Sequence, residues 1–391
     1  MKKHISLLLM AFMGASLVLG GCGKKTAVTP SPETQTEAQT DMPSDAQTAA
    51  GAEDKTAQNQ APDSPSGAAS SADSESGSGS ELNTGSDETK LTCQAAIRVG
   101  SLKGPTSMGL VSLMDKAARG ETSNVYEFTM AGKADELVGK IANGDLDIAL
   151  LPANVASVLY AKTQGNVTVL DINTLGVLYV VASDDSISSM ADLKGRTIYM
   201  TGKGTTPEYV VNYLLKENGL STSDVDLQFK SEATEVASLL KEDSSAIGVL
   251  PQPFATAACI QNPDLKTVLD LTEQWNLLNK DTGSMLVTGV TLVRSDFLRE
   301  NQAPVAEFLE EHAQSALFAT EHVEEAAELI AAQGIVEKAP IAQKALPYCN
   351  IVCLTGQEMK DALSGYLSTL MEQDPKSIGG QLPGDDFYYM P

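Results

Sequence analysis

Two loops of this chain carry hydroxyl side chains beside glycine and could bind a small ligand. They lie 99 residues apart, measured from Thr106 to Thr205. Each loop follows an apolar run that predicts a strand and precedes a pattern that predicts a helix. A glycine-containing turn at a helix N-terminus leaves backbone N–H groups unpaired, and such groups favour an anion or another strong hydrogen-bond acceptor. The residues concerned are Gly104, Pro105, Thr106 and Ser107 in the first loop, and Thr201, Gly202, Gly204, Thr205 and Thr206 in the second.

A simpler interpretation of the second loop is a helix cap that binds nothing. Pro207 suits the first turn of a helix, and Thr205 with Glu208 three residues later has the spacing of a capping box. The ligand-binding interpretation gains support because the register of 99 residues continues along the chain. Pro152, for example, falls on Pro251. Each half therefore reads as strand, loop and helix, followed by a second helix, a strand and a proline-containing loop.

The two proline-containing loops complete the predicted binding site. They contain Pro152, Ala153 and Asn154 in the first half, and Pro251, Gln252 and Pro253 in the second. All four loops follow the C-terminal ends of predicted strands, which is where open α/β sheets bind their ligands. We therefore predict one binding site between two similar lobes. Trp275, the single tryptophan, either lines that site or belongs to the core.

Residues for catalysis or metal binding are sparse. The three histidines are His4, His312 and His322, and no pair of them has the spacing of metal ligands. We expect His312 and His322 to be ordinary helix residues. The chain has no nucleophile-elbow motif, no Walker motif and no complete dinucleotide-binding fingerprint. The sequence thus predicts no catalytic residue, no metal site and no cofactor.

Besides Cys22, the chain has four cysteines, Cys93, Cys259, Cys349 and Cys353. Cys349 and Cys353 are four residues apart, which is weak evidence for a metal site when no further ligand is near in the sequence. An exported protein can form disulfides. The sequence leaves two interpretations open, buried free thiols or one disulfide.

The first 22 residues predict an export signal with a lipid attachment site. Lys2 and Lys3 precede an apolar segment over 5–19, which is too short and too close to the N-terminus for a membrane span. The sequence Leu19-Gly20-Gly21-Cys22 resembles a bacterial lipobox. We therefore predict that Cys22 is lipidated and becomes the mature N-terminus. An ordinary secretory signal that contains a cysteine is the alternative.

Composition separates a tether from an acidic domain. Residues 23–92 are rich in Ser, Thr, Ala and acidic residues with few aliphatic side chains, which predicts a disordered tether. The whole chain has 27 Lys and Arg against 51 Asp and Glu, a formal net charge of −24. Such a chain is unsuited to nucleic acid, which requires clustered basic side chains. It is also unsuited to anionic lipid surfaces, so we expect membrane contact through the lipid anchor only.

From 95 to 271, short apolar runs alternate with helical patterns, which predicts an α/β fold with mainly parallel sheets covered by helices. The longer apolar runs 175–182 and 285–293 are interpreted as two strands of a hinge, although two ordinary central strands would give the same pattern. On the hinge interpretation, one lobe comprises 93–183 plus 285–391 and the other comprises 184–284. The predicted strands lie near 95–100, 124–130, 146–151, 167–171, 196–200, 225–229, 246–250 and 266–270, and 295–373 is predicted to be mainly helical.

Four segments carry a resemblance to a known family: IRVGSLKGPTSMGL, NGDLDIALLPANVAS, DLKGRTIYMTGKGTTPEYVVNYLLKENGL and GVLPQPFA. With the GGQLPGDDFYY tail, 95–391 resembles the extracytoplasmic solute-binding proteins of ABC importers and is most similar to the nitrate, sulfonate, taurine and thiamine-precursor group. The resemblance implies a type II periplasmic-binding-protein fold, in which two lobes joined by a two-strand hinge close on one small ligand. It places the ligand at the loops named above. The cysteine-rich motif and active-site histidine of the enzymatic thiamine-precursor relatives are missing here.

We therefore expect a lipid-anchored, extracytoplasmic monomer that captures a small solute by hinge closure and delivers it to an ABC permease. A sulfonate, a nitrate-like anion, a carboxylate or a pyrimidine-type heterocycle would all suit loops rich in hydroxyls and backbone donors. Two alternatives remain, because a fold does not determine a function. One is an exported enzyme, similar to a lyase or dehydratase, on the same scaffold. The other is a surface adhesin with a vestigial cleft.

Overall fold

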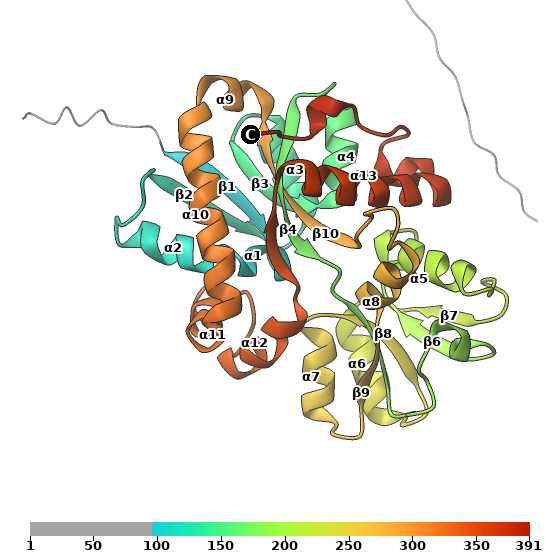
Figure 1. Ribbon diagram of the computed structural model, residues 1–391. Helices are drawn as coiled ribbons and strands as arrows, with labels where there is room; N and C mark the ends of the chain where they lie inside the picture. Colours follow the sequence, from blue (N-terminus) through green and yellow to red (C-terminus); the bar gives the residue numbers. More distant parts are fainter. Residues whose placement is uncertain (1–95) are drawn as a thin grey trace, which may run out of the picture. The chain divides into compact units, whose positions relative to one another are not determined.

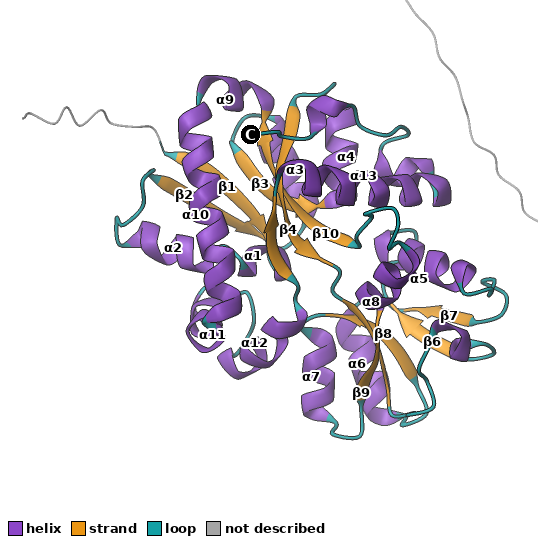
Figure 2. Cartoon of the chain, viewed as in Figure 1, coloured by secondary structure: helices purple, strands orange, loops and turns teal. Residues whose placement is uncertain are grey.

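Residues 96–391 form two β-sheets with helices packed around each of them (Figure 1 and Figure 2). The computed structural model describes these residues, and all of them belong to the compact unit 85–391. The predicted signal peptide and tether, including Cys22 and Cys93, lie outside the described residues.

The first sheet has six strands in the order β11-β4-β10-β3-β1-β2. They are β1 (Ile97–Leu102), β2 (Tyr126–Ala131), β3 (Ile148–Pro152), β4 (Val167–Leu175), β10 (Val287–Arg294) and β11 (Ile351–Leu354). β1 pairs in parallel with β2 and β3, whereas β10 is antiparallel to both β3 and β4. β3 is almost entirely buried, as its continuous apolar sequence predicts for a strand covered on both faces.

The second sheet has five strands in the order β7-β6-β8-β5-β9. They are β5 (Leu178–Ala182), β6 (Thr197–Met200), β7 (Asp226–Phe229), β8 (Ile247–Pro251) and β9 (Lys266–Asp270). β6 is parallel to β7 and β8, and β5 is antiparallel to β8 and β9.

The two sheets have the same strand order. Read from its other end, the first sheet runs β2-β1-β3-β10-β4, and each strand has its counterpart in the series β7-β6-β8-β5-β9. The pairing registers also correspond: Val99 lies opposite Ile148, and Ile198 lies opposite Ile247. Both residues of the second pair are 99 positions beyond those of the first. The offset found in the sequence is therefore the offset between equivalent positions of the two sheets.

The chain passes from one sheet to the other twice, and the first passage corrects a prediction. The run 175–182 was predicted as a single hinge strand of the first lobe, but β4 ends at Leu175 and β5 belongs to the second sheet. Gly176 separates the two strands at a crowded point, where an added Cβ would lie 2.2 Å from the Thr272 hydroxyl oxygen. The boundary predicted at 183 therefore lies before Leu178 instead. The return passage leads from α8 (Leu271–Leu278) into β10.

Helices cover the sheets (Figure 2). The helices that follow first-sheet strands are α1 (Pro105–Met108), α2 (Val111–Ala118), α3 (Ala134–Ala142), α4 (Ala153–Lys162), α9 (Ser295–Glu300), α10 (Gln302–Glu321), α11 (Val323–Ala332), α12 (Ala339–Ala345) and α13 (Gly356–Gln373). Those that follow second-sheet strands are α5 (Thr206–Glu217), α6 (Ala233–Glu242), α7 (Phe254–Gln261) and α8. Short 3₁₀ turns are η1 (Met190–Leu193), η2 (Leu346–Tyr348), η3 (Pro375–Ile378) and η4 (Asp385–Phe387). Within 96–391, none of these helices has the length and apolar character needed to cross a membrane.

Helix α13 joins the two sheets. It contacts β4 and β10 of the first sheet and also α5, which follows β6 of the second. Its apolar residues belong to a hydrophobic cluster that includes side chains from both sheets. Within this cluster, Tyr366 of α13 packs against Trp275 of α8, with ring centroids 5.7 Å apart. Trp275 is fully buried and donates its indole N–H to the Ser284 hydroxyl, so it is a core residue.

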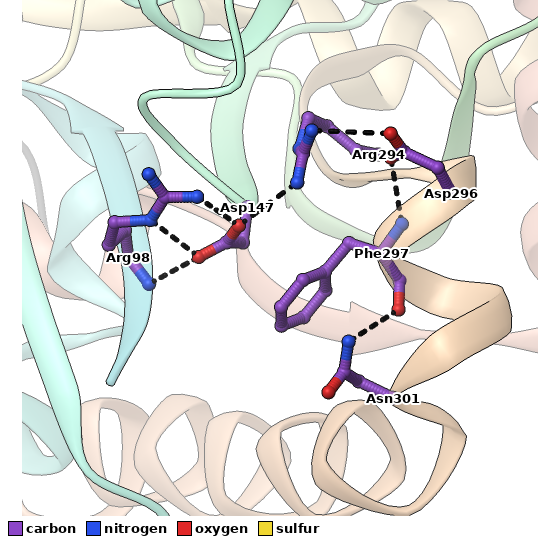
Figure 3. Close-up of polar contacts among 6 residues, drawn as sticks. All are labelled: Arg98, Asp147, Arg294, Asp296, Phe297 and Asn301. Atoms are coloured by element: carbon purple, nitrogen blue, oxygen red, sulfur yellow. Dashed lines mark hydrogen bonds and ion pairs between the residues drawn. The ribbon is translucent and has the colours of Figure 1, made fainter. Parts of the chain in front are cut away.

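An ion-pair cluster fastens the first sheet where β1 and β3 begin and β10 ends (Figure 3). The Asp147 carboxylate, whose side chain is 2% exposed, accepts hydrogen bonds from the Arg98 backbone N–H and from its guanidinium Nε and Nη2. Arg294 Nη2 lies 3.3 Å from the same carboxylate. Burial by itself would raise the pKa of Asp147, but the hydrogen bonds from Arg98 and the charges of both arginines outweigh it and lower that pKa. The cluster ties β1, β3 and β10 together away from the predicted ligand loops.

Candidate functional site

The four predicted loops lie at the C-terminal ends of β1, β3, β6 and β8. From the second sheet, the Gln252 backbone N–H donates to the Val177 carbonyl on the first passage, at 2.9 Å. From the first sheet, Thr106 packs against Gly289 at the start of β10, where an added Cβ would lie 2.2 Å from the Thr106 methyl carbon. The two passages pair with each other at Leu175 and Val287. One predicted loop from each sheet therefore borders the same junction.

The hydroxyls of the first loop are directed back onto its own strand. Thr106 Oγ1 donates to the Leu102 carbonyl at 2.9 Å, and Ser107 Oγ donates to the same carbonyl at 2.6 Å. Ser107 Oγ also lies 2.7 Å from Ser101 Oγ, and both serines are buried. Gly104 adopts φ 134°, which favours glycine. These contacts hold the loop in one shape, and a ligand would have to compete with Leu102 for the hydroxyl protons.

The second loop does not contain the predicted capping box. The Thr205 hydroxyl donates to the Gly202 carbonyl at 2.6 Å, and Glu208 accepts from the Gly204 backbone N–H at 2.5 Å. The left-handed conformations of Gly202 and Gly204, with φ of 85° and 70°, shape a turn that closes on itself before the helix starts. Thr206, the first residue of α5, hydrogen-bonds the side chain of Tyr366 in α13. The capping-box prediction was therefore wrong, while the turn at the start of a helix is present.

The proline-containing loops also direct their polar side chains to local partners. Asn154 Nδ2 donates to the Ser377 carbonyl at 3.4 Å. Gln252 is buried, and its side-chain oxygen accepts from the Thr256 hydroxyl at 2.8 Å. The structure thus places Pro152 and Pro251 at equivalent strand ends. The side-chain amides of Asn154 and Gln252 hold the two loops through local hydrogen bonds.

Residues distant in sequence join these loops, and the sequence analysis missed them. The Tyr209 hydroxyl lies 3.0 Å from both the Gly204 carbonyl oxygen and Asp374 Oδ2, so α5 and the end of α13 are hydrogen-bonded. Partial burial and the Asp374 carboxylate raise the pKa of Tyr209. Asn173 of β4 lies beside Gly289, where an added Cβ would be 2.5 Å from its side-chain oxygen. No local pattern could indicate the contacts of Tyr209 with Asp374 or of Asn173 with Gly289, because these partners are more than a hundred residues apart.

A second polar cluster lies where α10 packs against the first sheet. Asp171, His312 and Cys353 each offer a potential metal ligand atom, and these atoms lie within 4.8 Å of one another. His312 lies in α10, as a helix residue was predicted to, and its Nδ1 is 3.2 Å from Asp171 Oδ2. Burial and the Asp171 charge raise the pKa of the Cys353 thiol. Cys259, Cys349 and Cys353 are free thiols, so none of these three described cysteines forms the disulfide that the sequence left open.

Comparisons with known proteins agree with this architecture. Solved structures of similar fold include an ABC transporter protein from Parabacteroides distasonis, with 22% identity, a TM-score of 0.64 and coverage of 76% of this chain and 99% of that chain. The periplasmic aliphatic sulphonate-binding protein SsuA from Escherichia coli has 15% identity, a TM-score of 0.60 and coverage of 76% and 92%. The periplasmic sulfonate-binding protein SsuA from Methylobacillus flagellatus has 15% identity, a TM-score of 0.54 and coverage of 73% and 87%. At these identities the likeness establishes the fold, and the predicted periplasmic-binding-protein fold is confirmed.

The family follows from the sequence itself. A search among curated proteins found no match. A family model described as ABC transporter, phosphonate, periplasmic substrate-binding protein matches residues 121–343, which is more than half of the 391-residue chain. This match includes strands of both sheets and three of the four predicted loops completely. The chain belongs to the family of periplasmic substrate-binding proteins of phosphonate-type ABC transporters.

Proposed function

We propose that this protein binds a small phosphonate or sulfonate between its two sheets and delivers it to an ABC permease. One observation carries the proposal: one predicted loop from each sheet borders the same junction, through Gln252 on Val177 and Thr106 on Gly289. The matched family is named for phosphonate, and two structures of similar fold are named as sulfonate-binding proteins. Both ligand classes present several negatively charged oxygens, which suit backbone N–H groups at glycine-containing turns.

Local charge supports an anionic ligand despite the acidic chain. Lys103 and Lys203 are exposed residues of the first and second loops, one from each sheet. A ligand held between the loops would lie near both ammonium groups. It would contact both sheets, so it would favour the conformation in which they are closest. Hinge movement would then take place at Gly176 and at the return passage before β10.

The proposal extends to the cellular context predicted from the sequence. We propose an extracytoplasmic monomer held at the membrane by lipidated Cys22, with the permease as its protein partner. We propose binding without turnover, since the loops contribute hydroxyls and amides but no general base beside a nucleophile. An enzyme would convert the bound compound, so recovery of unchanged ligand after prolonged incubation distinguishes the two functions.

Calorimetric titration with methylphosphonate, ethanesulfonate, nitrate and acetate tests the site. Thr106→Ala removes a hydroxyl next to the proposed ligand and should weaken binding of the preferred anion about 5- to 150-fold, equivalent to about 1–3 kcal/mol. Thr163→Ala is a matched control, because Thr163 Oγ1 donates to the Leu159 carbonyl four residues earlier, at 2.8 Å, as Thr106 does to Leu102. The control should bind normally. Equal affinities of both variants and the wild type would remove Thr106 from the site, and no heat with any anion would contradict the ligand class.

The lipid anchor has a separate test. Cys22→Ala should abolish incorporation of radiolabelled or clickable fatty acid and either leave an unprocessed precursor or release the protein into the medium. Cys259→Ser is the control, because Cys259 lies in α7 far along the chain from the signal. Unchanged lipid labelling of the Cys22 variant would contradict the anchor without affecting the ligand proposal.

A further inference from the structure

The buried cluster of Asp171, His312 and Cys353 has a composition that the proposed ligand site does not explain. Asp171 lies in β4, His312 in α10 and Cys353 in β11, so three separate elements bring these side chains together. Asp171 and His312 are both 0% exposed. A carboxylate, an imidazole and a thiol are three of the side chains that proteins use to bind zinc.

The imidazole has unused hydrogen-bonding capacity. His312 Nδ1 faces Asp171 Oδ2, whereas Nε2 has no hydrogen-bond partner among the described residues although the whole side chain is buried. A buried nitrogen without a partner loses the hydrogen bond that water would provide. Because Nδ1 faces Asp171 Oδ2, a cation between the two side chains would be held by Nδ1 and would leave Nε2 unchanged.

The spacing matches one coordination sphere. Two N or O ligands of a tetrahedral zinc ion, each about 2.0–2.2 Å from the metal, are separated by roughly 3.3–3.5 Å. His312 Nδ1 and Asp171 Oδ2 are 3.2 Å apart, and the Cys353 sulfur lies within the 4.8 Å limit of the cluster. The three ligand atoms therefore lie close enough to one another to be drawn to one ion, with a fourth position open for water.

The cluster also has an outer partner and a route to solvent. Thr291 donates its hydroxyl to Asp171 Oδ1 at 3.0 Å and would fix the orientation of that carboxylate, as outer partners of metal ligands do. Cys353 lines a cavity of about 330 Å³ that Glu310 and Thr355 also border. An ion can reach the thiol through this cavity, and the Glu310 carboxylate favours a cation there.

We propose that Asp171, His312 and Cys353 form a binding site for a zinc-class divalent cation, separate from the ligand junction. The site ties β4 and β11 to α10, so the bound ion strengthens the first sheet at an edge strand with only one neighbour. The alternative is a structural Asp–His hydrogen bond beside an unrelated small apolar thiol.

Cobalt(II) is the probe, because it accepts the same tetrahedral ligands as zinc and gives a thiolate-to-metal charge-transfer absorption when cysteine binds it. The full chain is titrated with cobalt and then with competing zinc. The wild type should bind one equivalent of cobalt with the charge-transfer band, and zinc should displace it. Cys353→Ser should lose the band and bind zinc at least about a hundredfold more weakly. Loss of a residue that only hydrogen-bonds a metal ligand lowers metal affinity by about 10- to 100-fold, and loss of a ligand itself should cost no less. Cys259→Ser, a free thiol in the second sheet's α7, is the matched control and should keep the band.

Two results would overturn the metal site. One is a folded wild type that shows no charge-transfer band at saturating cobalt, a measurement that needs no variant. The other is a band that persists in Cys353→Ser, since another thiol would then hold the ion. If Cys353→Ser does not fold, as judged by circular dichroism, Cys353→Ala replaces it, because Leu309 and Ala313 beside the cavity tolerate a small apolar side chain.

Discussion

At the scale of single residues, the Asp147 carboxylate joins three strands through two arginines. Its side chain is 2% exposed, whereas Arg98 and Arg294 are 37% and 20% exposed. Arg294 Nε has no hydrogen-bond partner among the described residues and is buried, while Nη2 lies 3.3 Å from Asp147 and Nη1 lies 3.3 Å from Asp296, so two carboxylates balance this guanidinium. Removing the charge of Asp147 would take one carboxylate partner from each of the two arginines.

We predict that Asp147→Asn lowers the free energy of unfolding by about 3 kcal/mol at pH 7. This is the lower end of the range of about 3–5 kcal/mol for breaking a buried ion pair, because Arg98 is partly exposed to solvent. Since folding lowers the pKa of Asp147, its stabilising contribution is complete above the unfolded-state pKa of about 3.9 and is lost as pH falls through the lower folded-state pKa. The difference between wild type and variant should therefore shrink below about pH 4. Urea unfolding across pH measures it, with the exposed Asp264→Asn as control. A difference that stays constant with pH would exclude the ionised carboxylate as its cause.

The loops of the proposed ligand site were predictable in position, but the orientation of their side chains was not. Glycine and hydroxyl residues after apolar runs indicated the loops at Thr106 and Thr205, and the structure has turns at both places. The direction of each hydroxyl could not be predicted, because it depends on which carbonyl the turn brings near, Leu102 in one case and Gly202 in the other. Contacts such as Tyr209 with Asp374 depend on how α13 packs, and no local pattern encodes that packing.

At the scale of elements, the 99-residue offset found in the sequence recurs in the structure. The pairing of Val99 with Ile148 is repeated by Ile198 with Ile247, a register that was not predicted from the sequence. Hydrophobic periodicity fixes register when one face of a strand must be buried. The same periodicity could not divide β4 from β5, because both are apolar and only the crowding at Gly176 separates them. β11 was missed within a region predicted to be mainly helical, because a strand of four residues leaves too short a pattern.

Two glycines should respond to alanine in opposite directions. Gly176→Ala places a Cβ 2.2 Å from Thr272 Oγ1 and 2.7 Å from Leu286 Cδ2, so we predict a loss of about 1–3 kcal/mol in the free energy of unfolding. Gly139 is an exposed residue inside α3 with open space around it, and Gly139→Ala should increase the same quantity by about 0.5–1 kcal/mol. Urea titration of both variants measures the pair. A neutral Gly176→Ala would mean that the passage between the sheets relaxes freely.

At the scale of the whole molecule, α13 connects the two sheets. The proposed ligand binds at the junction between the same two sheets. Tyr209 and Thr206 of α5 both hydrogen-bond to residues in or directly after α13. Any closure about the passages has to preserve or rearrange these contacts. The Tyr209–Asp374 hydrogen bond is therefore expected to favour the conformation in which the sheets are close.

We predict that saturating ligand reduces the radius of gyration measured by small-angle scattering. Tyr209→Phe should give a larger radius without ligand and weaken ligand affinity about 2- to 10-fold, the effect of losing a hydrogen bond worth roughly 0.5–1.5 kcal/mol. Tyr213→Phe is the matched control, because Tyr213 hydrogen-bonds Asn279 within the second-sheet part of the chain. Equal radii with and without ligand would indicate that binding needs no closure. A Tyr213 variant that behaves like the Tyr209 variant would contradict the role of Asp374.

The position of β10 also determines the order in which the protein can fold. β10 lies between β3 and β4 in the first sheet, yet it is synthesised after the whole second sheet. A chain that emerges N-terminus first can complete β5 to β9 while β3 and β4 still wait for the strand that separates them. During that interval both waiting strands expose unpaired edges, which are templates for aggregation. The half of the molecule that begins first therefore finishes last, and molecular chaperones would be needed most while residues 176–286 are being synthesised.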